Sequence, residues 1–283
     1  MILMYQNGAS KVSKQLLVSI IMPAYNASNY IEKAINSVIY QSYTHWELII
    51  INDGSTDTTR QCVLNYTDTR IRYHEQANRG VSAARNLGLS YATGNFICFL
   101  DADDEYPFDS ILDRVSLFLE HPYLSFADGM VEVRDRNLDK VLYHKYHSWE
   151  GQVFDQLIQL NPDCFFGPSW MLKADIVNDI SFKEGMTHGE DLLFYIEAAR
   201  KGGYYKATNS CVLYYRKSSS SAMSNLDGLA KGYRILYASV KSMPESGFIP
   251  VFNLKMKIKK IMALSYLSKS QYLKACNALI SLP

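Results

Sequence analysis

The sequence predicts an α/β protein built on a doubly wound sheet flanked by helices. Three observations predict this fold. Strand and helix patterns alternate three times within the first 100 residues, the strand patterns are continuous apolar runs, and a polar turn follows each main run. Continuous apolar runs are typical of parallel strands that are buried on both faces. In such sheets ligands bind at the carboxyl ends of the strands.

The individual elements of the first half follow from apolar spacing and turn residues. We expect its strands at residues 16–22, 46–51, 71–74 and 95–100. Ser28 is placed to cap the first helix, and Ser55 or Thr56 to open the second. The third helix is expected over residues 80–92.

The second half of the sequence is less regular. Helices are expected at residues 107–119 and 190–200, and strands at residues 125–133, 140–146 and 211–216. This pattern predicts an N-terminal extension, one main domain and a helical tail. Their expected bounds are residues 1–16, 17–224 (divided into 17–104 and 105–224) and 225–283.

Composition narrows the class of protein. The 283 residues are 48% hydrophobic, enough for one sizeable core, and 29 basic against 28 acidic residues give no overall field that would attract nucleic acid. The five cysteines are widely spaced, which indicates reduced thiols and no zinc site. Residues 1–15 lack the order of a signal peptide, and no apolar run is long enough to span a bilayer. We therefore expect a cytoplasmic protein.

Three carboxylates follow directly on the apolar run at residues 96–100. Such closely spaced negative charges repel one another, and a hard cation bridged to phosphate oxygens is the usual reason to tolerate them at a strand end. The alternative is a solvated loop that caps the next helix. A calcium loop does not fit, because Tyr106 and Leu112 stand where it needs Gly and Glu. The three acids are Asp101, Asp103 and Asp104.

Two further loops follow strand patterns and should converge on the same crevice. Pro23–Asn26 follows the first strand, and Asn52–Ser55 follows the second. Asp53 is placed to bind a base or a ribose, while its alternative role is an Asx-turn with Ser55.

The polar turns that follow the strand patterns, taken in their order along the chain, resemble the motifs of family 2 glycosyltransferases of the GT-A fold. The resemblance covers residues 17 to about 220. The resemblance implies a mixed Rossmann-like sheet, an inverting transfer from a nucleotide sugar, and a glycosyltransferase domain at residues 17–224. Its first half would bind the nucleotide and its second half the acceptor. The matching segments are VSIIMPAYN at 18–26, NDGSTD at 52–57, ARN at 84–86 and DADD at 101–104.

The resemblance implies a UDP-linked sugar as donor and a set of contacts to it. Asp53 would contact the uracil, although Asn52 replaces a neighbouring acid of the family. The Tyr25 ring would stack on the base, and Arg85 would meet phosphate or instead pair with a nearby carboxylate. The full set is Pro23, Ala24, Tyr25, Asn26, Asp53, Arg79, Arg85, Asp101, Ala102 and Arg216.

The resemblance also implies a metal ligand and a catalytic base. Asp103 matches the acid that ligates Mn²⁺ or Mg²⁺. Asp191 matches the general base that deprotonates the acceptor hydroxyl, and Glu190 is its positional alternate. Both acids open a predicted helix, so simple stabilisation by the helix dipole is the alternative.

Two more residues are assigned to the sugar or acceptor, Trp170 because residues 167–170 resemble the family's stretch that lines the sugar site, and His188 by its position near the expected base. Trp170 could stack on a pyranose ring, and a buried core position is its alternative. His188 lies three residues before the expected base and is a candidate substrate contact.

The tail carries a basic amphipathic pattern. Lysines at 255, 257, 259 and 260 surround an apolar face made by Leu254, Ile258, Ile261, Met262 and Ser265. Such a helix fits peripheral docking on an anionic membrane, and its alternative is ordinary packing on the main domain.

Together these features predict a metal-dependent, inverting hexosyltransferase. It would move a hexose or N-acetylhexosamine from a UDP-sugar to a sugar hydroxyl of a glycan or lipid-linked oligosaccharide in surface polysaccharide biosynthesis. The alternatives are a non-catalytic sugar-nucleotide-binding module or accessory subunit, and a sugar-nucleotide pyrophosphorylase. Pyrophosphorylases open with a Gly-rich, basic loop, where this chain has Pro23–Asn26.

Overall fold

A computed structural model describes residues 16–217 and 225–281. Its first half is a four-stranded parallel sheet in the spatial order β3-β2-β1-β4. The strands comprise β1 (Val18–Ala24), β2 (Trp46–Asp53), β3 (Ile71–Gln76) and β4 (Phe96–Phe99). The expected first-half strands are therefore confirmed, with ends that differ by one to two residues.

The second half extends this sheet with strands of both directions. Strand β8 runs antiparallel to β4, and β5 then runs antiparallel to β8 and parallel to β9. The sheet is therefore mixed, as predicted. The added strands are β5 (Leu124–Arg134), β6 (Val141–Lys145), β7 (Gly151–Gln152), β8 (Met171–Lys173) and β9 (Tyr204–Arg216).

Helices cover both faces of the sheet because alternate strand residues point to opposite sides. Ile20 and Met22 join a core with α1, α2 and α4, whereas Ile21 joins the core on the other face with α5, α6 and α7. Helix α3 lies on this second face, over β1 and β2. The bounds are α1 (Ile31–Ile39), α2 (Thr59–Leu64), α3 (Val81–Tyr91), α4 (Ser110–Glu120), α5 (Phe154–Ile158), α6 (Ala174–Val177) and α7 (Glu190–Arg200).

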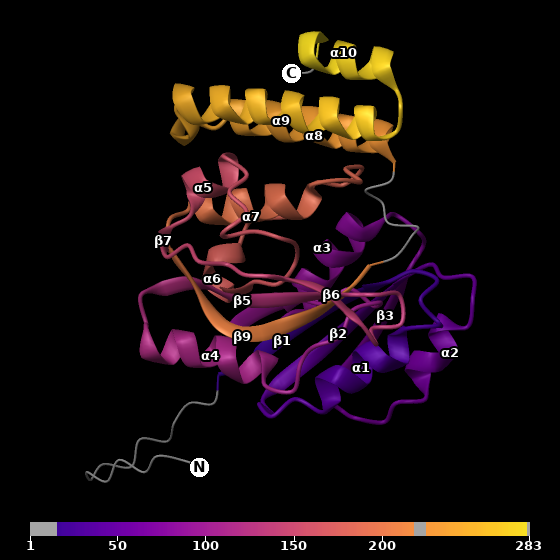
Figure 1. The fold of residues 1–283 in the computed structure, drawn as a ribbon. Helices are drawn as coiled ribbons and strands as arrows, with labels where there is room; N and C mark the ends of the chain where they lie inside the picture. The colour runs from indigo at the N-terminus through magenta and orange to yellow at the C-terminus, as the bar shows by residue number, and fades with distance from the viewer. Residues whose placement is uncertain (1–15, 218–224, 282–283) are drawn as a thin grey trace.

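The C-terminal helices form an additional layer on α5 and α7. Helices α8 and α9 pack together over this face, and α10 covers part of α9 (Figure 1). Leu254, Ile258 and Met262 of α9 are buried in the same core as α7. Packing of the tail on the main domain, which was the alternative to membrane docking, is thus observed for this face of α9. This layer consists of α8 (Leu226–Lys241), the short 3-10 helix η2 (Pro244–Ser246), α9 (Phe248–Ser268) and α10 (Tyr272–Ser281).

Several local predictions were wrong or incomplete. Helix α1 is preceded by Tyr30, and the Ser28 side chain does not cap it. Helix α2 begins at Thr59, where the carboxylate of Asp57 accepts the Thr59 N–H, so neither Ser55 nor Thr56 opens it. The late strand starts at Tyr204, seven residues before the predicted start.

In the part of the chain that the structure describes, no helix has the length and apolar character to cross a membrane. Residues 1–15 of the N-terminal extension that was predicted at 1–16 lie outside the described residues.

Candidate functional site

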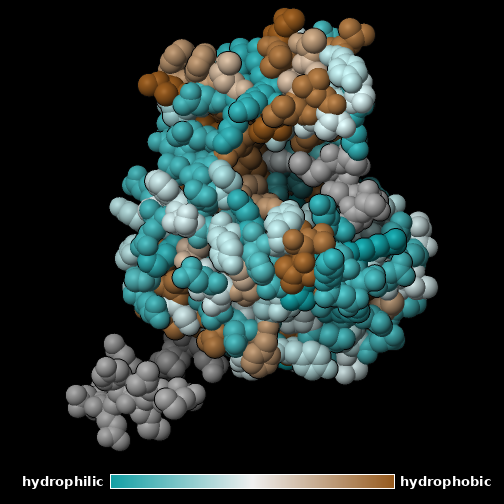
Figure 2. All heavy atoms as spheres, viewed as in Figure 1, coloured by the Kyte–Doolittle hydropathy of each residue, from teal (hydrophilic) through white to brown (hydrophobic). Residues whose placement is uncertain are grey.

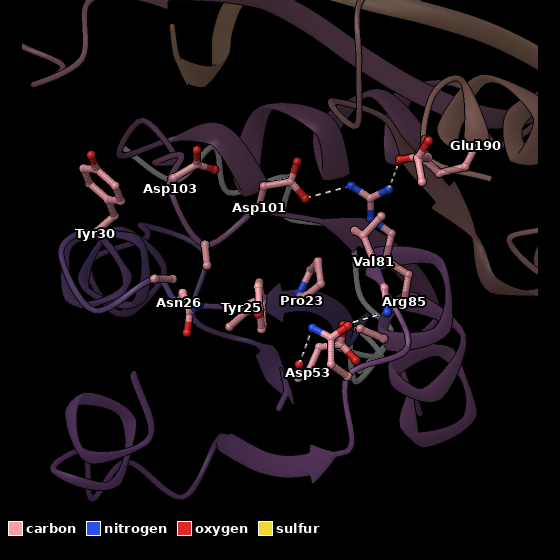
Figure 3. Close-up of a pocket in the computed structure, with 17 residues that line it drawn as sticks. Pro23, Tyr25, Asn26, Tyr30, Asp53, Val81, Arg85, Asp101, Asp103 and Glu190 are labelled. Atoms are coloured by element: carbon pink, nitrogen blue, oxygen red, sulfur yellow. Dashed lines mark hydrogen bonds and ion pairs between the residues drawn. The ribbon is translucent and has the colours of Figure 1, made fainter. Parts of the chain in front are cut away.

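A cavity of about 590 Å³ lies at the carboxyl ends of β1, β2 and β4 (Figure 3). The three loops predicted to converge all reach it, which confirms the crevice. Its walls also include the start of α3 and the start of α7. The lining residues are Pro23, Ala24, Tyr25, Asn26, Ala27, Tyr30, Asp53, Asn78, Gly80, Val81, Ala84, Arg85, Asp101, Ala102, Asp103, Thr187 and Glu190.

Asp53 is held in place by donors from the loop before α3. Its carboxylate accepts the backbone N–H of Arg79 at 2.9 Å and that of Gly80 at 2.8 Å, and the Gln76 amide at 2.6 Å. Gly54 follows with φ of +69°, and a Cβ there would lie 2.7 Å from the backbone nitrogen of Asn78. Only glycine suits that position, because both conformation and space exclude a side chain.

Asn52, and not Asp53, forms the Asx-turn with Ser55 that was the alternative role predicted for Asp53. The Asn52 side-chain oxygen accepts the Ser55 N–H at 3.0 Å, and its amide donates to the Tyr73 hydroxyl at 2.8 Å. Asn26 then ties the first loop to the second, because its side-chain oxygen accepts the Thr56 N–H at 2.8 Å. An amide can donate and accept at once, which a carboxylate at position 52 could not do.

The three acids after β4 have different surroundings. Asp104 is fully buried and accepts the Arg216 N–H at 2.7 Å, and Asp101 forms an ion pair with Arg85 at 2.8 Å. Burial, and then the charges of Asp103 and Asp101, raise the pKa of Asp104 well above its usual range. Burial and the neighbouring Asp101 carboxylate raise the pKa of Asp103 to about 6.

Asp103 is the acid of this loop that best fits a metal ion. It lines the cavity, and no ion pair to it occurs within the described residues. A nearby divalent cation would relieve its repulsion with Asp101. The described residues contain no group of three His, Cys, Asp or Glu side chains around a common point, so most ligands would come from a diphosphate and water.

Arg85 joins the two halves of the site (Figure 3). Its buried guanidinium lies 2.8 Å from Asp101 and 3.2 Å from Glu190, and 5.3 Å from the centre of the Phe182 ring. Burial disfavours its charge, but these carboxylates and Asp191 more than offset burial and raise the pKa of Arg85. The ion pair that was the alternative role of Arg85 is therefore observed, and Arg85 also lines the cavity.

The start of α7 is fixed by neighbours on α3. The Asn86 side chain donates to the Phe182 carbonyl at 2.9 Å and accepts the Phe182 N–H at 2.7 Å. Gly189 precedes α7 with φ of +72°. The motif at residues 84–86 thus holds the segment that carries the two candidate catalytic acids.

Those two acids occupy different positions. Glu190 lines the cavity, whereas Asp191 is not one of the lining residues and accepts the Leu192 N–H at 2.7 Å. Burial and the adjacent Glu190 carboxylate raise the pKa of Asp191 to about 7, against the opposing effect of Arg85. A carboxyl with that pKa can exchange a proton near neutral pH.

The other two predicted arginines do not point into the cavity. The Arg79 side chain is exposed and pairs with Glu184 at 2.8 Å. Arg216 is buried, with its guanidinium over the Tyr30 ring and donating to the carbonyls of Asp103 and Arg136. In the structure, Arg216 therefore stabilises the acidic loop through hydrogen bonds to Asp103 and Asp104.

Trp170 and His188 lie apart from the cavity. Trp170 is completely buried, with its ring 4.7 Å from that of Tyr195 and 4.8 Å from that of Tyr205, so its assignment to a sugar site is corrected to a core position. His188 is also buried, and its backbone carbonyl lies directly against Gly232 of α8. Its role as a substrate contact has no support in this geometry.

Several lining residues escaped the sequence analysis. Asn78 and Gly80 follow the end of β3, so strand order alone could have found them. Tyr30 and Thr187 carry no such signal. They reach the cavity only through the packing of α1 and of the loop before α7.

Comparison with known sequences gives consistent matches. The family model described as Glycosyl transferase family 2 matches residues 19–180. An uncharacterized glycosyltransferase of Haemophilus influenzae is 42% identical over 248 residues, which are 87% of this chain and 90% of that protein. UDP-Glc:alpha-D-GlcNAc-diphosphoundecaprenol beta-1,3-glucosyltransferase WfgD of Escherichia coli is 35% identical over 214 residues, covering 74% of this chain and 80% of WfgD. A longer glycosyltransferase of Rickettsia felis is 34% identical, and this chain spans about a third of its length.

Solved structures show the same fold at low sequence identity. TarS residues 1–349 of S. aureus, crystallised with UDP-GlcNAc, superpose with a TM-score of 0.68 at 19% identity, over 95% of this chain and 82% of that chain. Mannosyltransferase PcManGT of Pyrobaculum calidifontis, in complex with GDP-Man and Mn²⁺, superposes with a TM-score of 0.66 at 18% identity. The match covers 92% of this chain and 73% of that chain.

Proposed function

Because the chain belongs to glycosyltransferase family 2 and has the GT-A fold, we propose that it is an inverting, metal-dependent hexosyltransferase acting on a UDP-sugar. The donor would carry a hexose or an N-acetylhexosamine. We assign the catalytic domain to residues 17–224, with the nucleotide bound by residues 17–104.

One observation carries this proposal: the acids of three separate elements face one cavity. Asp53 is the last residue of β2, Asp103 follows β4 and Glu190 opens α7. The cavity of about 590 Å³ falls within the size range typical of small-molecule sites. The exposed Tyr25 ring lies at its nucleotide side and offers a stacking surface for a base.

The residues divide the chemistry between them. Asp53 and Tyr25 would bind the base, and Arg85 would orient Asp101 and Glu190 while it offers a donor to phosphate. Asp191 would take the proton of the attacking sugar hydroxyl, as its pKa near 7 allows. Asp103 would hold Mn²⁺ or Mg²⁺, which when bound neutralises charge on the leaving diphosphate.

The acceptor is proposed from the relatives. WfgD acts on an α-D-GlcNAc-diphosphoundecaprenol, and a second relative is a putative teichuronic acid biosynthesis glycosyltransferase, TuaG of Bacillus subtilis. We propose by analogy a glycan or lipid-linked sugar acceptor in surface polysaccharide synthesis, met at the cytoplasmic face of the membrane.

The test is release of UDP from a panel of UDP-sugars, with Mn²⁺ or with a chelator, in the presence of a prenyl-diphosphate-linked N-acetylglucosamine. We expect one donor to turn over with metal only. Asp103→Ala should lower that rate on the order of a hundredfold or more, because the diphosphate loses its counter-charge. Asp109→Ala is the matched control, since Asp109 is an exposed acid eight residues beyond Asp101.

Two outcomes would contradict the proposal. UDP binding without turnover of any donor, even by hydrolysis, would favour the non-catalytic binding module. Full activity of Asp103→Ala in the presence of a chelator would remove the metal from the proposal.

A further inference from the structure

The end of the chain differs sharply in charge from the rest. After Glu245 the sequence contains six lysines and no acidic residue, whereas the residues up to Glu245 contain 23 basic and 28 acidic ones. The last 38 residues are therefore strongly positive within a chain of net charge +1. A local field of this size attracts anionic surfaces.

The outer side of α9 carries apolar residues that were missed in the sequence. Its inner side is buried as described above, and α10 covers its C-terminal half, where Ala263 and Tyr266 are buried. The outer side of its N-terminal half is exposed within the part of the chain that the structure describes. Phe248 is 84% exposed there, and its ring stacks on that of Phe252 at 6.3 Å between centroids. The exposed residues of this half are Phe248, Ile249, Phe252 and Met256.

Helix α10 continues this surface. Ala275 and Ala278 face α9, and the opposite side exposes Leu273 (84%) and Ile280 (79%). Hydrophobic side chains gather over these helices at the top of the molecule in Figure 2. We call the set the C-terminal apolar surface; it comprises Phe248, Ile249, Phe252, Met256, Leu264, Leu267, Tyr272, Leu273, Leu279 and Ile280.

Most lysines beside this surface lack a carboxylate partner. Lys274 pairs with Asp227 at 2.8 Å, and it is the one lysine after Glu245 with an ion pair among the described residues. Lys257 donates to the carbonyls of Gln159 and Leu160 in the main domain, and Lys259 donates to carbonyls at the end of α10. Lys260 and Lys269 are exposed. The surface is therefore apolar and basic at once.

We propose that the C-terminal apolar surface docks on an anionic lipid bilayer. Large apolar side chains flanked by lysines match the boundary between lipid headgroups and acyl chains, where both kinds of group are stabilised. A second copy of the chain is a poorer occupant, because it would bring two sets of uncompensated lysines together. This inference does not depend on the donor, the metal or the base proposed above.

The experiment is vesicle flotation of the full chain. Phosphatidylcholine vesicles are compared with vesicles of equal parts phosphatidylcholine and phosphatidylglycerol, at low and high salt. We expect binding to the anionic vesicles that weakens with salt. The variant Phe248→Ser/Ile249→Ser/Leu273→Ser should bind at least about tenfold more weakly, since three inserted side chains are lost. Lys260→Glu/Lys269→Glu should lose about tenfold or more on anionic vesicles.

The controls separate docking from misfolding and from self-association. Phe108→Ser/Leu119→Ser removes two exposed apolar residues from the main domain and should bind vesicles like the wild type. All these positions are exposed, so folding should persist, and circular dichroism with thermal unfolding checks it. Absent binding to anionic vesicles, or unchanged binding of the triple variant, would overturn the proposal. The proposal would also be overturned if light scattering showed a dimer that the triple variant abolishes, while vesicle binding of that variant stays the same as that of the wild type.

Discussion

The two halves of the molecule build the cavity in different ways. In the first half, the acids that line the cavity lie at or just after strand ends, so the parallel sheet and its short loops place them. In the second half, Thr187 and Glu190 are the lining residues in the described chain, and contacts distant in sequence place them. Arg85 and Asn86 hold this segment from one side, and Gly232 of α8 packs against it from the other. Sheet topology thus places the cavity-lining acids of the first half, and tertiary packing places the lining residues of the second half.

The sharpest test of this difference concerns the acids of the second half. Asp191→Asn should lower kcat about a thousandfold, because the amide cannot take a proton. In the wild type, the pKa of Asp191 near 7 predicts that the rate rises as pH increases through 7, since the base must be ionised. The pH profile of kcat/KM measures both.

The matched variant is Glu190→Gln. Glu190 lies at the cavity wall and pairs with Arg85, so we expect a weaker effect on kcat and a larger one on donor KM. If Glu190→Gln lost more kcat than Asp191→Asn, and its kcat/KM no longer changed with pH, the role of base would be assigned to Glu190.

A second comparison contrasts two buried ion pairs. Arg85 and its acids line the cavity, whereas His147 and Asp128 are enclosed in the second half, with 2.7 Å between Nδ1 and Oδ2. Burial lowers the pKa of His147, but Asp128 more than offsets it, so the net pKa is raised. Burial raises the pKa of Asp128, but the charge of His147 and hydrogen bonds to the carboxylate more than offset burial, so the net pKa is lowered.

These directions fix the pH window in which the pair stabilises the fold. The His147 contribution is fully present below the unfolded pKa of about 6.5 and is lost as pH rises through the higher folded pKa. The Asp128 contribution is present above about 3.9 and is lost as pH falls through its lower folded pKa. Stabilisation should therefore be greatest between about pH 4 and 6.5.

His147→Gln tests that window. At pH 6 it should lower the free energy of unfolding by about 3 kcal/mol, because Asp128 stays buried without its cation. Urea unfolding across pH measures it, and the decline of the wild type above neutral pH should be missing in the variant. His121→Gln, at a partly exposed histidine, is the control. An identical pH dependence in wild type and His147→Gln would contradict the assignment.

The same contrast explains what could be predicted from sequence. Asp53, Asp101 and Asp103 were found because strand ends and consecutive motifs identify them without tertiary knowledge. Trp170 was assigned to a sugar site because a sequence does not show whether the segment just before β8 faces the cavity or the core; in the structure it is completely buried. The second apolar face of α9 was missed because α10 covers only half of that helix, and helical spacing alone does not show which half stays exposed.

The smallest expected effects, on two glycines, bear most directly on how the halves differ. A Cβ at Gly88 would lie 2.4 Å from Cγ2 of Ile21, and one at Gly232 would lie 2.3 Å from the backbone oxygen of His188. Each replacement by Ala should lower the free energy of unfolding by about 1–2 kcal/mol, because the clash outweighs the helix propensity that Ala adds. Gly167→Ala should be near neutral, since nothing lies within 4 Å of its Cβ position.

Kinetics then separate the two variants. Gly88→Ala displaces a side chain between α3 and β1, while the loops at the strand ends keep their hydrogen bonds, so kcat should stay near that of the wild type. Gly232→Ala presses on the backbone just before Glu190 and Asp191, so kcat should fall about tenfold for a small displacement of the base. Equal kcat in both variants would mean that α8 supports the fold without positioning α7. A loss confined to Gly232→Ala would make the C-terminal layer part of the catalytic architecture.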